Sequence, residues 1–172
     1  MKRPIIRHLA WHKWATDRLF ALLDQLPEPV YMSDRGSSHG GIHGTAVHIY
    51  GAEKLWIDRI NGNPEAKIYD EELFPEKSWN GLKTAWVELS DGLFRDVMEW
   101  PELFWEKKIY YRTIAGLPFE HMVVEILDHV IAHAAYHRGQ IISMVRQAGK
   151  EDAQIAKLQI QSLDLMEFYR TT

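Results

Sequence analysis

Residues 121–149 read HMVVEILDHVIAHAAYHRGQIISMVRQAG, and this stretch decides the predicted fold because it places four of the nine histidines on one amphipathic helix. His129, His133 and His137 recur every four residues, so they form one stripe with successive members about 40° and roughly 6 Å apart. The apolar residues of the helix lie on the face that carries His133 and His137, whereas His129 lies at the edge of that face. We therefore predict that His133 and His137 point into the protein.

Three more amphipathic helices are predicted upstream, where apolar residues recur at helical spacing. They cover residues 5–26, 42–60 and 78–101. Ser78 is the predicted N-terminal cap of the third of these helices, and Pro101 ends it. The helix that carries the histidine stripe is predicted to open at Pro118 and to close at Gly149.

The segments between the helices are predicted to be irregular or extended. Residues 31–41 are rich in Ser, Asp and Gly, which predicts a loop. Residues 103–117 are rich in aromatic and β-branched types, which predicts a short hairpin or extended excursion. The acidic run at residues 70–72 is interpreted as part of a solvated loop. Ser162 is predicted to cap a short segment, residues 163–169, that folds back on the helices.

Four long helices with few strands predict an all-α protein, an antiparallel four-helix bundle with a short hairpin or extended excursion before the last long helix. The chain has 172 residues, 46% of them hydrophobic, which predicts a single domain over residues 1–172 with a sizeable core. The net charge is −4 and no basic cluster is present, so no nucleic acid partner is expected. No run approaches the roughly 20 apolar residues of a membrane span, so we expect no membrane partner and a cytoplasmic location.

Any metal site in this chain must be built from histidine. The absence of cysteine removes disulfides, thiolate zinc sites and a cysteine nucleophile. Helix bundles form metal sites in their cores from the side chains of facing helices, and His48 lies on the inward face of the predicted helix 42–60. His48, His133 and His137 are therefore the candidate metal ligands.

Two interpretations of these three histidines are open. Three neutral imidazoles around an open position are the arrangement of catalytic zinc, and an octahedral ion such as nickel or iron accepts the same ligands. The alternative is that each is an ordinary core histidine, hydrogen-bonded to a neighbour. Burying three imidazoles costs desolvation unless each ring nitrogen finds a partner, and one shared cation meets that need for all three. Spacing alone does not choose between the two.

No other catalytic motif accompanies the histidines. The chain has no His-Glu-x-x-His, no Gly-x-Ser-x-Gly and no paired carboxylates at helical spacing beside them. No side chain is therefore assigned as a catalytic nucleophile, and any chemistry is predicted to be metal chemistry. An open metal position activates water, polarises a substrate oxygen or holds a substrate thiolate.

Two segments carry a resemblance to a known family. GIHGTAVHIYGAEKLWIDRING, residues 41–62, and DHVIAHAAYHRGQIISMVRQAG, residues 128–149, resemble the DinB-like, or YfiT-like, superfamily of metal-dependent hydrolases. Trp14 and Ala15 fit the opening motif of that superfamily, and the similarity covers nearly the whole chain.

The resemblance implies a four-helix bundle, commonly a homodimer, with one divalent metal ion per chain on three histidines. By motif matching these are His48, His133 and His137, and zinc and nickel are the ions we expect first. Characterised relatives are thiol-dependent S-transferases and isomerases, so the resemblance implies a small-molecule substrate, with a low-molecular-weight thiol among the candidates. We expect a hydrolase or a thiol S-transferase. The alternative is a non-catalytic, metal-binding stress-response protein.

Three positions depart from the family pattern. Ala132 replaces a common asparagine, Gly41 stands where a serine often caps the second helix, and His12 occupies a position that is often asparagine. We expect the residues around the ligands to be His12, which lies in the apolar stripe of the first helix, His129 and Gln140. Arg138 lies away from the ligand stripe, which predicts an ion pair or a packing role at a helix or subunit interface.

Overall fold

The computed structural model describes residues 2–68, 78–113 and 115–172, and this part of the chain is mostly helical with two small hairpins. The four long helices are α1 (Lys2–Leu23), α3 (Ile42–Ile60), α4 (Trp79–Glu99) and α5 (Val123–Glu151). The shorter helices are α2 (Glu28–Met32), η1 (Glu102–Glu106), η2 (Ile155–Lys157) and α6 (Leu165–Thr171). The hairpins pair β1 (Asp34–Ser37) with β2 (Gly40–Gly41) and β3 (Lys108–Arg112) with β4 (Pro118–Met122). The acidic run at residues 70–72 lies outside the described residues.

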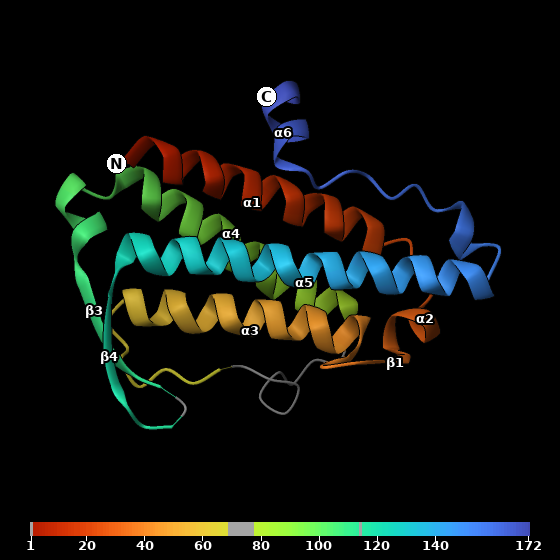
Figure 1. The fold of residues 1–172 in the computed structure, drawn as a ribbon, viewed down its shortest axis with the longest axis horizontal. Coiled ribbons are helices and arrows are strands. Elements are labelled where there is room, and N and C mark those ends of the chain that lie inside the picture. Colours follow the sequence, from red (N-terminus) through yellow and green to blue (C-terminus); the bar gives the residue numbers. More distant parts are fainter. Residues whose placement is uncertain (1, 69–77, 114) are drawn as a thin grey trace.

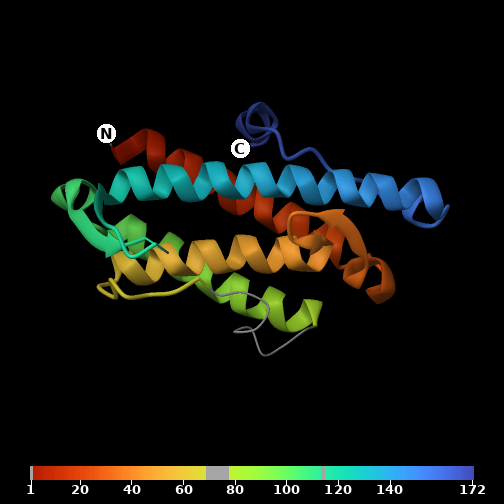
Figure 2. The same cartoon turned by 60° about the horizontal axis from the view of Figure 1, so that its bottom comes forward.

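The long helices pack side by side, with α1 and α3 each lying against both α4 and α5. Figures 1 and 2 show that α1 and α5 run in one direction and that α3 and α4 run in the other. The prediction of an all-α protein is confirmed, but the four helices do not alternate in direction.

The boundaries of α3 and α4 match those predicted. Helix α3 begins at Ile42, directly after Gly41. The Ser78 side chain accepts a hydrogen bond from the backbone N–H of Gly81 at 3.2 Å, which satisfies one of the unpaired donors in the first turn of α4. Pro101 follows the C-cap of α4.

The prediction that the last long helix opens at Pro118 is wrong. Residues 118–122 form β4, which pairs with β3 in a register that joins Pro118 to Arg112 and Met122 to Lys108. Helix α5 starts only at Val123, where Glu125 accepts a hydrogen bond from the N–H of Met122 at 2.8 Å. His121 therefore lies on a strand, and three histidines rather than four share α5. The hairpin expected within residues 103–117 is confirmed and extends to Met122.

The segment at residues 31–41 is also more ordered than the predicted loop. Part of it forms the β1–β2 hairpin, in which Asp34 pairs with Gly41. A Cβ atom on Gly41 would lie 2.1 Å from the backbone oxygen of Ser33, so no side chain fits there. The close approach of the hairpin backbone explains why Gly41 stands where a capping serine is common.

The buried side chains form two apolar clusters. One contains Leu19, Trp86 and Ile141, and the other contains Leu9 and Ile126. None of the helices in the described ranges combines the length and the apolar character needed to cross a membrane.

The C-terminal segment folds back on the helices, as predicted. Asp164, rather than Ser162, caps α6, because its side chain accepts from the N–H groups of Met166 and Glu167. Phe168 packs edge-on against Trp14, with 5.6 Å between the ring centroids. This contact fixes α6 to α1.

Candidate metal centre

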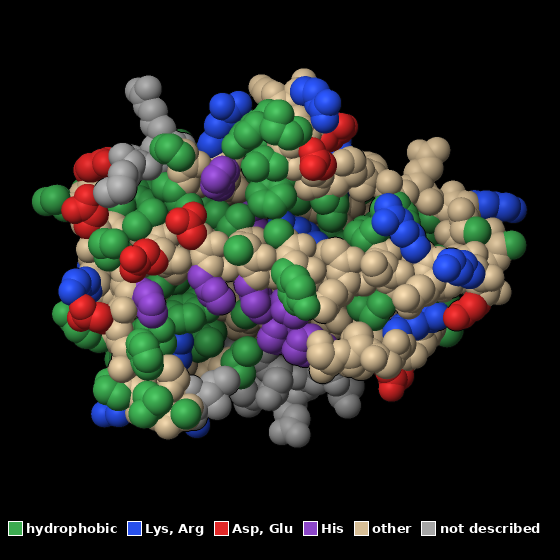
Figure 3. Space-filling view, viewed as in Figure 1, with side chains coloured by type: hydrophobic (Ala, Val, Ile, Leu, Met, Phe, Trp, Pro, Cys, Tyr) green, Lys and Arg blue, Asp and Glu red, His purple; other side chains and the backbone are tan. Residues whose placement is uncertain are grey.

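The packing of α3 against α5 brings the three predicted ligands together. The Nε2 atoms of His48 and His133 are 3.0 Å apart. The ring centroid of His137 lies 4.6 Å from that of His48 and 4.4 Å from that of His133. Figure 3 shows histidine side chains in a row across this face of the molecule, ending in a dense group.

The rings of His48, His133 and His137 lie close together and are inclined to one another. Their planes are inclined to one another by 55° to 75°, so their nitrogen lone pairs are not parallel. Two nitrogens on one tetrahedral zinc, each bonded at about 2.0–2.1 Å, lie about 3.3 Å apart. The separation of 3.0 Å between His48 Nε2 and His133 Nε2 is close to that value. A group of three histidines at this place, made of His39, His48 and His137, is compatible with a metal-binding protein.

A fourth histidine, which the sequence did not indicate, joins this cluster. His39 lies at the tip between β1 and β2, and its ring stacks on that of His48 with a centroid distance of 3.8 Å and an interplanar angle of 16°. One ligand nitrogen from each of His39, His48 and His137 lies within 4.8 Å of the other two. His39 was missed because a turn residue belongs to no helical period, so no spacing argument points to it.

The surroundings of the cluster favour neutral imidazoles, the form that binds metal. Burial, followed by the nearby His39, His133 and His137, lowers the pKa of His48 to about 4. Burial, followed by the other histidines, also lowers the pKa of His133 to about 4. The pKa of His39 is lowered by burial and by His137. No proton has to leave His48 or His133 at neutral pH before an ion binds.

Gln140 lies where a residue that orients a ligand is expected. Its side-chain oxygen is 2.7 Å from Nδ1 of His137, so Nδ1–H donates and the amide oxygen accepts. This hydrogen bond places the ring proton of His137 on Nδ1 and leaves Nε2 free to bind an ion. The orienting role of Gln140 remains a prediction.

His129 lies beside the cluster rather than within it. Its ring centroid is 5.7 Å from that of His133 and 5.6 Å from that of Trp56, and its side chain is exposed. This position agrees with its place at the edge of the predicted stripe. A role in supporting His133 remains a prediction.

His12 is buried in a polar network of the core. Its Nε2 is 3.3 Å from Glu53 Oε1, and its Nδ1 accepts a hydrogen bond from Arg138 at 3.1 Å. A guanidinium only donates, so the ring proton of His12 lies on Nε2, facing Glu53. Within the described part of the chain, the polar contacts of His12 are with Glu53 and Arg138 rather than with the three predicted ligands.

Arg138 joins α5 to α1 within this network. It also donates to Thr16 at 3.1 Å, and its side chain is fully buried. Burial lowers its pKa to about 10, although the charge of Glu53 acts in the opposite direction, so the guanidinium is still charged at neutral pH. Glu53 in turn accepts a hydrogen bond from Trp86 at 2.7 Å. The prediction of an ion-pairing or packing role for Arg138 agrees with this position.

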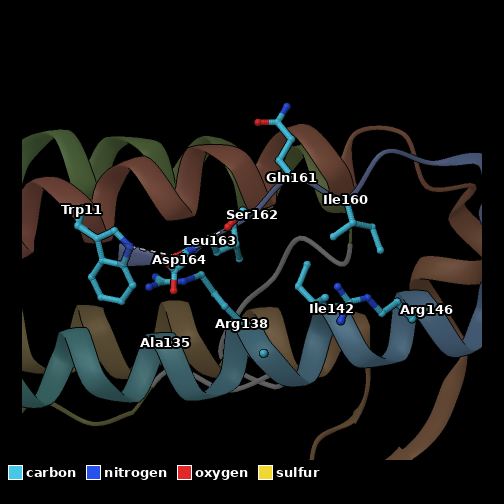
Figure 4. Close-up of a pocket in the computed structure, with 11 residues that line it drawn as sticks. Trp11, Ala135, Arg138, Ile142, Arg146, Ile160, Gln161, Ser162, Leu163 and Asp164 are labelled. Carbon is cyan, nitrogen blue, oxygen red and sulfur yellow. Dashed lines mark hydrogen bonds between the residues drawn. The ribbon is translucent and has the colours of Figure 1, made fainter. Parts of the chain in front are cut away.

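A cavity of about 460 Å³ lies on another side of α5, between α1 and residues 160–164. Figure 4 shows Arg138 directed from α5 toward this segment, and the indole N–H of Trp11 donating to the Leu163 carbonyl, at 3.0 Å. Ala135 and Gly139 line the cavity, and they follow His133 and His137 by two residues. Two residues correspond to about 200° around a helix, so these positions lie on nearly opposite sides of α5. The cavity is therefore separate from the histidine cluster.

The chain is similar in sequence to a known family and to a characterised bacterial protein. The model of the DinB family matches residues 1–164 of the chain. Protein DinB of Bacillus subtilis (strain 168) is 27% identical over 149 residues, which cover 83% of this chain and 85% of the relative. The region that the family model matches contains all four clustered histidines.

Proposed function

Since the chain belongs to the DinB family, we propose that it is a metal-dependent enzyme built on a four-helix bundle. One divalent ion, zinc or nickel first among the candidates, is bound by His48, His133 and His137. The substrate is a small molecule, and the reaction is a hydrolysis or the transfer of a low-molecular-weight thiol. The observation that supports this proposal best is the close approach of three mutually inclined imidazoles from α3 and α5.

The residues of the chain prepare the site before an ion arrives. Burial keeps His48 and His133 neutral, and Gln140 fixes the ring orientation of His137. A bound divalent ion supplies Lewis acidity, which makes a water or a thiol a better nucleophile at neutral pH. The two helices hold the ligands at fixed positions, so little reorganisation is needed when substrate binds.

The alternative is a metal-binding protein without catalytic activity. The position of His39 favours it, because an ion with four protein ligands and no open position is typical of a structural zinc site. The distinction depends on whether a small molecule can reach the ion.

Elemental analysis of protein purified without an affinity tag or chelator tests the metal site. We expect about one divalent ion per chain in the native protein and a large loss in the His133→Ala variant. His121→Ala is the matched control, because His121 lies on β4 and is hydrogen-bonded to Tyr111. Equal metal content in all three proteins would show that the cluster is not the site.

An activity screen tests catalysis separately. The metal-loaded protein is offered a low-molecular-weight thiol with an electrophile and, in parallel, a set of simple esters. We expect turnover that is lost in His48→Ala while the helical circular dichroism signal is retained. Metal binding without turnover in either series would favour the non-catalytic alternative.

We also propose that the chain forms a homodimer. Three large apolar side chains of the β3–β4 hairpin are exposed, namely Tyr110 at 63%, Leu117 at 57% and Phe119 at 50%. Apolar surface of this kind is common at interfaces between subunits. Light scattering after size-exclusion chromatography measures the mass directly, and a mass near 20 kDa at all concentrations would contradict the dimer.

A further inference from the structure

The β1–β2 hairpin places His39 against the candidate ligands although it belongs to neither helix that carries them. Its ring covers that of His48, 3.8 Å away, and meets His137 edge-on at 5.3 Å. We infer that His39 is a fourth, exchangeable ligand of the bound ion, and that a thiolate substrate takes its place. This inference rests on the proposed metal site and adds to it the group that occupies the open position.

The hairpin holds His39 near the ion. Arg35 of β1 forms an ion pair of 2.7 Å with Glu151 at the end of α5. The pairing of Asp34 with Gly41 ties the same end of the hairpin, its base, to the start of α3. The base of the hairpin is thus fixed to both helices that carry the candidate ligands, and a nitrogen of His39 at the tip lies within 4.8 Å of a ring nitrogen of His48 and of His137.

The orientation of the His39 ring distinguishes it from the other three. The rings of His48, His133 and His137 are inclined to one another, whereas His39 is nearly parallel to His48, at 16°. The lone pairs of two parallel rings do not converge on one point. His39 must therefore turn about its side-chain torsions to reach the ion.

Two arrangements of the site follow from this rotation. With the ring turned toward the ion, four nitrogens complete a tetrahedral coordination and leave no open position. With the ring stacked on His48, one position is free for an incoming ligand. A thiolate is a softer and negatively charged ligand, so it competes well with a neutral imidazole for zinc. A thiol that binds in this way loses its proton to the surrounding buffer.

Cobalt-loaded protein provides a readout that does not depend on turnover. The affinity for Co²⁺ is measured by competition with a chelator, and the binding of 2-mercaptoethanol is followed by the visible absorption of the ion. We expect His39→Ala to bind Co²⁺ at least about tenfold more weakly. We expect the same variant to be saturated at a lower thiol concentration than the native protein, because no imidazole has to be displaced. His39→Gln should behave in the same way, and His121→Ala should match the native protein in both measurements.

The expected affinity of the variant for Co²⁺ falls while its affinity for the thiol rises. A role of His39 in packing alone would not produce these opposite changes. If His39→Ala matches the native protein in metal affinity and in thiol affinity, His39 is not a ligand and the inference is overturned. The inference is also overturned if His39→Ala binds both the metal and the thiol more weakly than the native protein. The variant His137→Ala tests the underlying site: if it retains native Co²⁺ affinity, the proposed metal site itself is wrong, whatever His39 does.

Discussion

Nδ1 of His137 lies 2.7 Å from the side-chain oxygen of Gln140, one turn further along α5. Because this contact holds the imidazole in the tautomer that leaves Nε2 free, we expect Gln140→Ala to weaken metal binding roughly 10–100-fold. Chelator competition measures the change. Gln140→Glu should restore the affinity, since a carboxylate accepts the same hydrogen bond. Gln147→Ala, an exposed change on the same helix, should have no effect, and an equal loss in both alanine variants would contradict the role of Gln140.

The stability of the metal-free protein should fall as the pH is lowered from about 6.5 to about 4. In this window the unfolded chain binds protons at His48 and His133, whereas the folded chain does not, because their pKa values are lowered to about 4. The free energy of unfolding therefore decreases with decreasing pH. Urea denaturation at several pH values measures how steeply the free energy of unfolding depends on pH. The double variant His48→Gln/His133→Gln should show a shallower dependence. Identical slopes would mean that these two imidazoles are not neutral in the folded protein.

Removal of the metal should lower the melting temperature. An ion at 100 times its dissociation constant stabilises the folded state by about 2.7 kcal/mol, which corresponds to roughly 5–10 °C for a chain of this size. Thermal unfolding with and without a chelator measures the shift. The His133→Ala variant should melt at the same temperature in both conditions, and a chelator effect of native size in that variant would contradict the site.

Replacement of Arg138 should destabilise the fold without emptying the metal site. Arg138→Met removes the buried hydrogen bonds that the guanidinium makes with His12 and Thr16, together with the positive charge near Glu53, and we expect a loss of about 1.5–3 kcal/mol. Chemical denaturation measures this loss, and elemental analysis should still find native metal content. Arg146→Met, an exposed change on the same helix, should alter stability by less than about 0.5 kcal/mol. A loss of metal in folded Arg138→Met would show that the network and the histidine cluster are coupled.

Gly41 should tolerate no side chain. Gly41→Ala places a Cβ atom 2.1 Å from the Ser33 oxygen, so the hairpin has to move, and we expect a loss of about 1–3 kcal/mol in stability. Gly92→Ala is the control, because a Cβ there meets no atom within 4 Å and a helical alanine is favoured by about 0.5–1 kcal/mol. Denaturation of both variants measures the difference. A Gly41→Ala protein as stable as the native one would contradict the close approach.

Helix positions and the inward side of each helix could be predicted from the sequence because they depend on local period. The boundaries of α3 follow from the glycines before Ile42 and the Asn-Gly pair after Ile60. This reasoning predicts that three histidines lie close together, and the structure places them side by side; they are His48, His133 and His137. Their assignment as the metal ligands stays a prediction.

Features that depend on pairing between distant residues were not predictable in this way. The start of α5 was misplaced because the register that joins Met122 to Lys108 is a cross-strand relation, which helical spacing does not reveal. The partner of His12 is Arg138, 126 residues away, and a helical wheel treats the two separately. His39 was missed for the same reason, since its proximity to His48 arises from the path of a turn.

The origin of the clustered histidines has a kinetic consequence. His133 and His137 are neighbours on α5 from the moment that helix forms, but His48 lies 85 residues before His133 in the chain and meets it only after α3 has docked. An ion added during refolding would therefore meet two nitrogens early and three only late. The rate at which refolding chains acquire the absorption of bound Co²⁺ therefore measures how fast α3 docks against α5.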